Sequence, residues 1–367
     1  MAKTKAQKIR PPKITMWFSN VYSVSETFLL RPSDGPIKAT LPTPSNITVT
    51  LTPARPHEIK GTVDGLFCEA LAMREVKKDV AEMLQSIEHG LLPLDGTNQA
   101  KLPYTSLFEP HTIIDIEGHI APKHAVPLEY LPQRLHDFVR ATSRDLAETA
   151  RRFITTLRWR QRASTAVRPF ASLGSFWSSD GNHWNSMPGG YYAVVETPTG
   201  IAAGPEMDEA INTLFQNDEY EPLAHELARE ALALCATSPR SALITAVVAL
   251  ETGVKHYIKD AAPNTSWLIE NLPSPPVERL VTEYIPEINA AAGRPELPLT
   301  SKELDLLKKR ISQRNYVAHG ATSSVDARNL KEFIKFVINV LYRLDFCRGL
   351  TWAQELADQD IASTQTP

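Results

Sequence analysis

Apolar residues recur at helical spacing along the second half of the chain. Steps of three and four residues place such positions on one face of a helix. The recurring positions are Leu223, Leu227, Ala231 and Leu234; Leu243, Val247, Leu250, Val254 and Tyr257; and Phe333, Val337, Val340, Leu344 and Cys347. These three sets predict helices at 219–237, 241–259 and 325–349. Residues 302–319 predict a further helix, which makes four and is the third in chain order. Between the second and third of these helices, residues 263–298 contain seven prolines and predict a long connection with one or two short helices.

The first half of the chain has a different pattern. Residues 14–53 are rich in Thr, Val, Ile and aromatic residues and are interrupted by Pro, Gly, Ser and Asp, which is typical of several short strands. The remaining expectations are a more helical segment at 63–90, a strand at 112–120, a long helix at 133–163 after Pro132, loop and strand at 167–190, and a last strand at 191–197. Strands and helices do not alternate regularly, as they would in a doubly wound sheet.

These patterns predict an α+β chain with two domains. A mixed strand and helix domain, which we expect to sense a signal or select a substrate, covers residues 14–204, and an all-α four-helix domain covers 205–357. Residues 1–13 carry five basic residues without a core pattern and predict a disordered arm. Residues 358–367 predict a disordered tail.

Composition narrows the class of protein. The chain has 367 residues, of which 43% are hydrophobic and 22% charged, as in soluble globular proteins. Cys68, Cys235 and Cys347 lie far apart, so neither a disulfide framework nor a cysteine zinc site is indicated, and we expect a cytoplasmic protein. The apolar run at 242–250 is far shorter than the roughly 20 residues of a membrane span. No phosphate-binding loop or common hydrolase motif is present, and we expect no cofactor and no metal.

Charge is unevenly distributed along the chain, although the net charge is only −3. Nine arginines lie within residues 133–168, and ten lysines and arginines lie within 301–349. Two locally basic segments can form a footprint for the phosphates of a nucleic acid, or they can be solvated helix faces. The candidate RNA-binding residues are Lys308, Lys309, Arg310, Arg158, Arg160 and Arg162.

The segment from Arg314 to His319 is the strongest candidate for chemistry. Arg314 continues a helical stripe of apolar residues, formed by Leu304, Leu307, Ile311 and Ala318. Gly320 predicts the end of this helix, because glycine adopts the left-handed conformation without a Cβ clash. His319 therefore lies in the last helical turn, where the helix dipole favours the imidazolium form.

This segment resembles the Arg-x4-His motif of HEPN (higher eukaryotes and prokaryotes nucleotide-binding) domains. The resemblance covers roughly residues 218–350 and rests on Arg314, Asn315 and His319 at the end of the third long helix of a helical bundle. Residues 241–251 resemble the second helix of such domains, which often carries an acidic residue near the site. The resemblance assigns that role to Glu251. For residues 1–200 no family resemblance is recognised.

The resemblance implies an endoribonuclease that cleaves RNA by 2′-OH attack without a metal, often in toxin or antiviral-defence systems. His319 would transfer protons, Arg314 would contact phosphate oxygens, and Asn315 would orient a hydroxyl or the imidazole. Glu251 would hold Arg314. A homodimer would bring two motifs together, and an antitoxin or trigger protein is a further expected partner.

Two other interpretations of the motif stand beside this one. Arg314 can pair with a carboxylate and His319 can cap its helix for structural reasons alone. A HEPN-like domain can also bind RNA or protein without cleaving it and act as a regulatory protein.

The N-terminal domain contains a rival candidate site. Asp115, Glu117 and His119 would share one face of a strand and have the side chains of a metal site, although the polar solvent face of a half-buried strand explains them more simply. A cluster of aromatic residues can stack bases or form core. Its members are Phe170, Phe176, Trp177, His183, Trp184, Tyr191 and Tyr192.

Overall fold

The computed structural model describes residues 13–24, 28–29, 36–41, 46–53, 66–88, 91–93, 99–101, 131–163, 170–188, 201–202, 206–271, 276–320 and 325–357. Backbone contacts divide the chain into two compact units. The first comprises residues 1–154 and 168–219, and the second comprises 155–167 and 220–367. The predicted tail, and the predicted arm apart from Lys13, lie outside the described residues, and Lys13 is the first residue of a strand.

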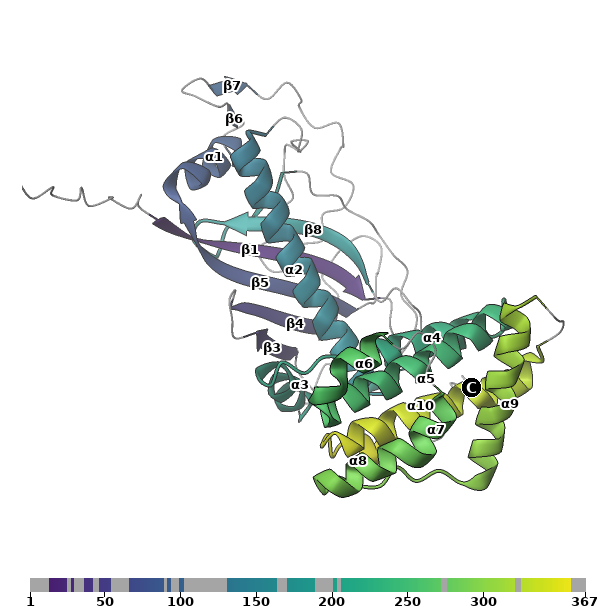
Figure 1. Ribbon diagram of the computed structural model, residues 1–367. Coiled ribbons are helices and arrows are strands. Elements are labelled where there is room, and N and C mark those ends of the chain that lie inside the picture. The colour runs from purple at the N-terminus through teal and green to yellow at the C-terminus, as the bar shows by residue number, and fades with distance from the viewer. Residues whose placement is uncertain are drawn as a thin grey trace, which may run out of the picture. The chain divides into compact units, whose positions relative to one another are not determined.

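The first unit is built on a six-stranded antiparallel sheet (Figure 1). Its strand order is β3 (Ile37–Leu41), β4 (Ile47–Pro53), β5 (Leu66–Lys77), β1 (Lys13–Val24), β8 (Phe170–Ser178) and β9 (Asn185–Ser186). Two smaller pairings join β2 (Phe28–Leu29) to β10 (Ile201–Ala202) and β6 (Leu91–Pro93) to β7 (Gln99–Lys101). The short strands expected at 14–53 are thus present, whereas those expected at 112–120 and 191–197 lie outside the described residues.

Strand β5 corrects the helical expectation for residues 63–90. Within this segment only the second part is helical, as α1 (Lys78–Glu88). In the first part Cys68, Ala70 and Ala72 are completely buried, which is the two-residue period of a strand. Alanine is a weak strand former, so local composition concealed a strand that its neighbours β4 and β1 hold on both edges.

Helix α2 (Gln133–Arg160) confirms the long helix predicted after Pro132, and it lies across one face of the sheet (Figure 1). The ring of Phe138 on α2 meets Phe18 of β1 edge to face at 5.3 Å. Beside it, Nη2 of Arg74 on β5 lies 3.1 Å from Oδ2 of Asp145 on α2. An apolar contact and an ion pair therefore fix the helix on the sheet.

Helix α3 (Glu206–Gln216) protects the edge strand β3. The backbone nitrogen of Lys38 donates to Oδ1 of Asp208 at 3.1 Å, and that of Thr40 donates to Oδ1 of Asn212 at 3.0 Å. Side chains thus occupy backbone donors that an edge strand otherwise exposes to other chains. Because of these contacts α3 belongs to the first unit, and the division between units follows Glu219 rather than Gly204.

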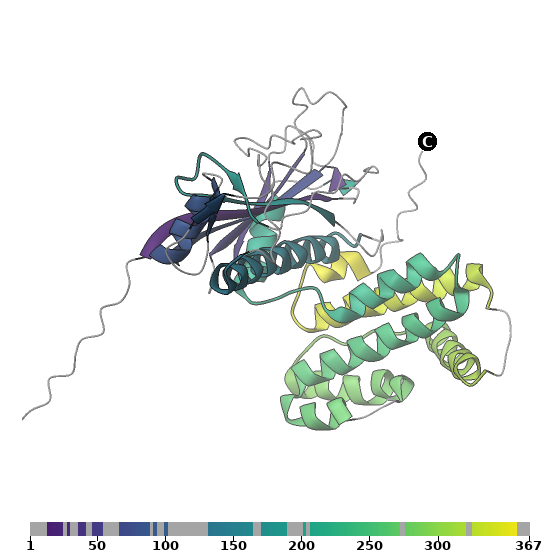
Figure 2. The same cartoon turned by 90° about the horizontal axis from the view of Figure 1, so that it is seen from above.

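The second unit contains the four predicted helices. They are α4 (Leu223–Leu234), α5 (Pro239–Ala261), α9 (Ser301–Ala318) and α10 (Ala327–Cys347). Helix α5 packs against the other three. Figure 2 shows α9 nearly end-on while the other three helices lie in the plane of the view, so α9 crosses them steeply. The chain is therefore of mixed α+β class, with a sheet-containing unit and a largely helical one.

Close packing at Gly253 joins three of these helices. A Cβ atom at this position of α5 would lie 2.2 Å from Cδ2 of Leu341 on α10 and 3.3 Å from Cβ of Ala224 on α4. Glycine is the residue that lets these backbones approach so closely. The requirement comes from packing, because Gly253 is within a regular helix.

The proline-rich connection contains more helix than predicted. It forms η2 (Pro263–Thr265), α6 (Ser266–Asn271), α7 (Val277–Arg279), the π-helical turn η3 (Leu280–Tyr284) and α8 (Ile285–Ala292). Outside this connection, a short last helix, α11 (Ala353–Ala357), follows α10. Pro286 lies in an unbroken helical run formed by α7, η3 and α8, directly after the π-helical turn, which is a common irregularity inside helices. Proline content therefore overstated the irregular structure here.

Candidate functional site

Helix α9 carries the candidate motif and has well-defined ends. At its start, Thr300 and Glu303 form a reciprocal capping box, for which the Thr-x-x-Glu spacing in the sequence is the signal. At its end, His319 is the C-cap residue, and Gly320 adopts the left-handed conformation with φ of 74°. The predicted glycine stop and the place of His319 in the last turn are both confirmed.

Arg314 of α9 and Glu251 of α5 form an ion pair inside the helical unit. Nη2 of Arg314 donates to Oε1 of Glu251, and the two side chains are only 17% and 15% exposed. Nη1 of Arg314 donates to Oδ1 of the neighbouring Asn315 at 3.1 Å. Both terminal nitrogens thus have acceptors, while Nε has no hydrogen-bond partner among the described residues. Three of the four candidate catalytic residues are therefore in direct contact.

Electrostatics at this pair are governed by burial. Removal from water raises the pKa of the Glu251 carboxyl, and the positive charges of Arg314 and Lys255 oppose that rise. The carboxylate is consequently a group whose charge depends on its arginine partner. The charge of Glu251 on α5 therefore depends on the position of Arg314 on α9.

His319 lies apart from the ion pair. It is exposed, and no hydrogen bond to Arg314 is found within the described part of the chain. A separation of five residues rotates the two side chains about 140° around an ideal helix and about 7.5 Å along its axis, which accounts for their different surroundings. The protein thus presents a half-buried cation and an exposed imidazole at the same helix end.

The apolar stripe expected around Arg314 is displaced. Of its four expected members, Leu307 is buried, Leu304 and Ile311 are half-buried, and Ala318 is exposed. Arg310 is buried instead, at 5% exposure, and donates from Nη1 to Oε1 of Gln313 at 2.7 Å. Burial lowers the pKa of its guanidinium. Arg310 is therefore an interior residue, which corrects its assignment to an RNA-binding surface.

The two lysines beside it remain at the surface. Nζ of Lys308 lies 3.1 Å from Oε1 of Glu278 on α7, and this ion pair offsets its charge. Lys309 is exposed, and no ion pair is found for it among the described residues. Of the three expected RNA-binding residues on α9, Lys309 is the one best placed to contact a phosphate.

The three arginines at the end of α2 pack within the second unit. Arg158 is 2% exposed. The guanidinium of Arg160 lies 4.7 Å from the ring centre of Trp352, and that of Arg162 lies 5.5 Å from the ring centre of Tyr342. Burial therefore corrects the assignment of Arg158 to an RNA interface, whereas Arg160 and Arg162 are half-buried against aromatic rings.

A buried polar cluster nearby was missed by sequence reasoning. Asp345 of α10 is 3% exposed and accepts a hydrogen bond from Nε1 of Trp159 at 2.9 Å. Nε2 of His225 lies 2.8 Å from the same carboxylate oxygen, and Nη1 of Arg348 lies 3.5 Å from the other. Polar residues on the apolar faces of two predicted helices were the available signal. Deep burial makes this cluster a structural element.

Part of the rival candidates in the first unit lies outside the described residues. Asp115, Glu117 and His119 lie outside the described residues, and within those residues no group of three or more metal-ligating side chains is assembled. Phe176, Trp177 and Trp184 are buried, as core residues are, whereas His183 is exposed. Tyr191 and Tyr192 lie outside the described part of the chain.

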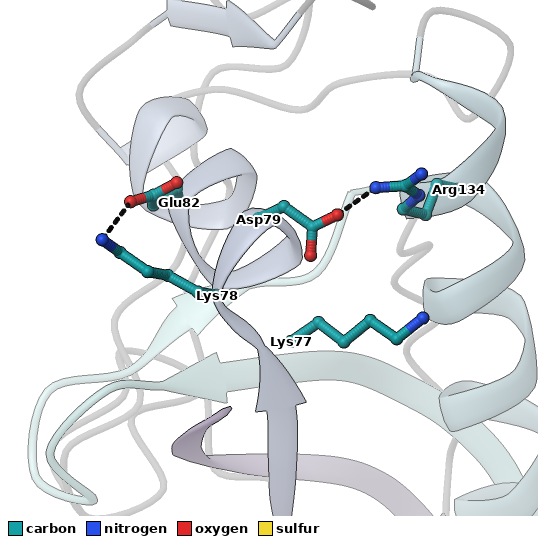
Figure 3. A pocket seen from close by; sticks show the side chains of 5 residues that line it. All are labelled: Lys77, Lys78, Asp79, Glu82 and Arg134. Carbon is teal, nitrogen blue, oxygen red and sulfur yellow. Dashed lines mark hydrogen bonds and ion pairs between the residues drawn. The ribbon is translucent and has the colours of Figure 1, made fainter. Parts of the chain in front are cut away.

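A shallow hollow at the junction of β5 and α1 is lined by charged residues (Figure 3). Arg134 forms an ion pair with Asp79, and Nζ of Lys78 lies 3.4 Å from Oε1 of Glu82. The side chain of Lys77 extends toward α2. Because four of the five lining residues pair with each other, the hollow presents little net charge to a ligand.

Comparisons with protein-family models, with curated proteins and with solved structures find no match to the chain. Across the described residues, no helix combines the length and the apolar character needed to cross a membrane. The geometry of the helical unit is therefore the basis for a functional proposal.

Proposed function

We propose that the helical unit is a HEPN-type domain that cleaves RNA without a metal at the end of α9. The observation that carries this proposal is the Arg314–Glu251 ion pair between α9 and α5, with Asn315 bonded to the same arginine and His319 exposed at the helix end. Arg314 is then a cation held in place, and His319 is an accessible proton-transfer group five residues further along the chain.

The reaction is transesterification at a phosphodiester. The ribose 2′-oxygen bonds to phosphorus as its proton passes to a base, and the bond from phosphorus to the 5′-oxygen breaks as an acid protonates that oxygen. The products carry a 2′,3′-cyclic phosphate and a 5′-hydroxyl. His319 serves as one proton-transfer group, because imidazole exchanges protons near neutral pH. Arg314 offsets the charge that the phosphate gains in the transition state.

Asn315 and Glu251 complete the proposed site. Glu251 holds the guanidinium from the side of α5, and Asn315 holds it from within α9. Through its amide, Asn315 also orients the imidazole or the attacking hydroxyl. Full acid and base catalysis needs a second proton-transfer group, which a second copy of the chain would supply from its own motif. The proposal therefore includes a homodimer, and its cellular setting is a cytoplasmic toxin or antiviral-defence effector controlled by an antitoxin or trigger protein.

A second candidate function is non-catalytic binding of RNA or protein by the same unit. The partial burial of Arg314 favours it, together with the bonds to Asn315 and Glu251 that already engage two of its five N–H donors. Lys309 remains accessible in either case. The two candidate functions differ in whether RNA is cut.

Incubation of the full chain with RNA in EDTA tests the proposal, with the 5′-hydroxyl ends of the products measured. We expect cleavage that survives EDTA and falls about 10²- to 10⁴-fold in His319→Ala. In Arg314→Ala we expect a loss of about 10²- to 10³-fold. Binding without cleavage by the wild type would favour the non-catalytic function.

Matched controls separate catalysis from loss of fold. His183→Ala removes an exposed histidine of the first unit, and Arg279→Ala removes an exposed arginine that pairs with Glu283 on the same run of helices. Both variants should cleave like the wild type. If they lose activity as strongly as the motif variants, the motif has no special role.

A further inference from the structure

One flank of α9 carries a continuous stripe of exposed side chains. Its members follow steps of three and four residues and are all exposed: Lys302, Asp305, Lys309, Ser312, Tyr316 and His319. This spacing stacks them on one side of the helix, about 25 Å long at 1.5 Å per residue. Figure 2, where α9 is nearly end-on, shows that one of its flanks faces away from α5 and α10.

Tyr316 is the unusual member of this exposed stripe. Its side chain is 60% exposed although it is large and aromatic. His319 follows it by three residues and Ser312 precedes it by four, so both are its neighbours on the helix surface. An aromatic ring held on a regular helix beside an imidazole offers a flat stacking surface at the proposed point of cleavage.

Charge extends this surface along the helix. Lys309 precedes Tyr316 by seven residues, two helical turns, which places it about 10.5 Å away along the same stripe. Arg314 and Arg310 are not members of this stripe, because they lie half-buried and buried on other faces of the helix. The stripe therefore combines one aromatic ring, one exposed lysine and one exposed imidazole in a line.

We infer that this stripe binds single-stranded RNA, with one base stacked on Tyr316 and the backbone running past Lys309, an inference that rests on the proposed function for its choice of RNA. An aromatic side chain with a nearby cation is the usual means of holding an unpaired base and its phosphate. A base stacked on Tyr316 places its own phosphodiester next to His319. Tyr316 thereby selects the unpaired nucleotide at which cleavage occurs.

Charge and composition favour this occupant over a second protein. The core of a stable protein interface is apolar, whereas Tyr316 is the one large apolar side chain of the stripe, between polar and charged residues. Duplex RNA keeps its bases paired and stacked internally, so their faces are not available to the tyrosine ring. Single-stranded RNA satisfies both requirements.

Binding of a non-cleavable strand tests the inference independently of catalysis. The probe is a short, mixed-sequence, fluorescein-labelled 2′-O-methyl oligonucleotide, compared with the same backbone carrying abasic sites, and anisotropy measures the Kd for the full chain. Tyr316→Ala should raise the Kd for the base-bearing strand roughly 5- to 150-fold and leave the abasic strand unchanged. Tyr316→Phe keeps the ring and should bind like the wild type.

Two further variants complete the design. Trp267→Ala removes an aromatic side chain of α6 that is 74% exposed, and it should leave the Kd unchanged. Lys309→Ala should weaken both strands and reduce the dependence of log Kd on log salt by about 0.7, the loss of one phosphate contact to a single strand.

Each other outcome has one meaning. Wild-type affinity in Tyr316→Ala would overturn the inference, and so would equal weakening toward both strands. An effect of Tyr316→Ala on self-association alone, measured by sedimentation, would make the stripe a protein interface and overturn it as well. Tyr316-dependent binding without any RNA cleavage would support the inference and count against the proposed function, whereas cleavage that ignores Tyr316 would do the reverse.

Discussion

Nη2 of Arg314 on α9 donates a hydrogen bond to Oε1 of Glu251 on α5, joining residues 63 positions apart in the chain. Because both side chains are mostly buried, each charge depends on the other for compensation. The pair also fixes the helix end that carries His319. Its contribution to folding and its contribution to the proposed chemistry can be measured separately.

Breaking this pair should cost more stability at neutral pH than in acid. Burial raises the pKa of Glu251 in the folded protein above its ordinary value of 4.5. The folded state therefore holds the proton of Glu251 more tightly than the unfolded state. The stability that this proton contributes is complete below pH 4.5 and is lost as the pH rises through the folded pKa. Arg314 limits that decline. In Arg314→Met the decline should grow, and urea unfolding should show a loss of about 1–3 kcal/mol at neutral pH that shrinks in acid.

The exposed pair of Arg279 and Glu283 provides the comparison for this experiment. Both side chains are well exposed, so Arg279→Met should change stability by less than about 1 kcal/mol. An equal loss for Arg314→Met at both pH values would show that the charge of Glu251 is not coupled to the arginine.

Asp345→Ala should destabilise the helical unit strongly. The substitution leaves Nε1 of Trp159 and the ring of His225 buried without their acceptor. Breaking a buried polar pair typically costs about 3–5 kcal/mol, which urea unfolding followed by circular dichroism will measure. Glu283→Ala, which removes an exposed carboxylate, should have little effect. A mild effect of Asp345→Ala would mean that water replaces the lost oxygen atoms.

Gly253→Ala should destabilise the packing of α5 against α10. The added methyl group would overlap Cδ2 of Leu341, a residue that is itself 2% exposed and has little room to move. Overpacking of this kind costs about 1–3 kcal/mol even though alanine is the better helix former. Shortening the partner in Gly253→Ala/Leu341→Val should recover part of the loss. A stabilised single variant would contradict the packing argument.

The thiols of Cys68 and Cys347 should resist alkylation in the folded protein. Burial raises the pKa of Cys347 to about 11 and raises that of Cys68 as well. Less thiolate is then present at mildly alkaline pH, and the thiolate is the reactive form. Mass spectrometry after iodoacetamide treatment should find both thiols unmodified until urea is added. Fast labelling of Cys68 in the native protein would show that its strand opens readily.

Local sequence signals predicted the elements whose causes are local. Gly320 indicated the end of α9, and the apolar periodicity around Val247 indicated α5. Strand β5 was missed because Ala70 and Ala72 are poor strand formers and their burial depends on neighbouring strands. The ends and faces of α9 and α5 thus follow from residues within each helix, whereas β5 depends on pairing with other strands.

The roles of the basic residues depended on distant partners. Arg162 contacts Asn339, 177 positions later, and Arg310 is enclosed within the helical unit. A run of basic residues gives no information about such partners, so these arginines were assigned to an RNA surface. By contrast, the pairing of Glu251 with Arg314 was expected from the resemblance, and the structure contains it.

We propose that the end of α9 cleaves RNA, and single-turnover cleavage in EDTA by wild type and His319→Ala decides whether it does. We predict 5′-hydroxyl and 2′,3′-cyclic phosphate ends for the wild type, and a rate about 10²- to 10⁴-fold lower for a variant that unfolds at the same urea concentration. Equal rates for the two proteins, or no cleavage by the wild type of any RNA tested, would contradict the claim.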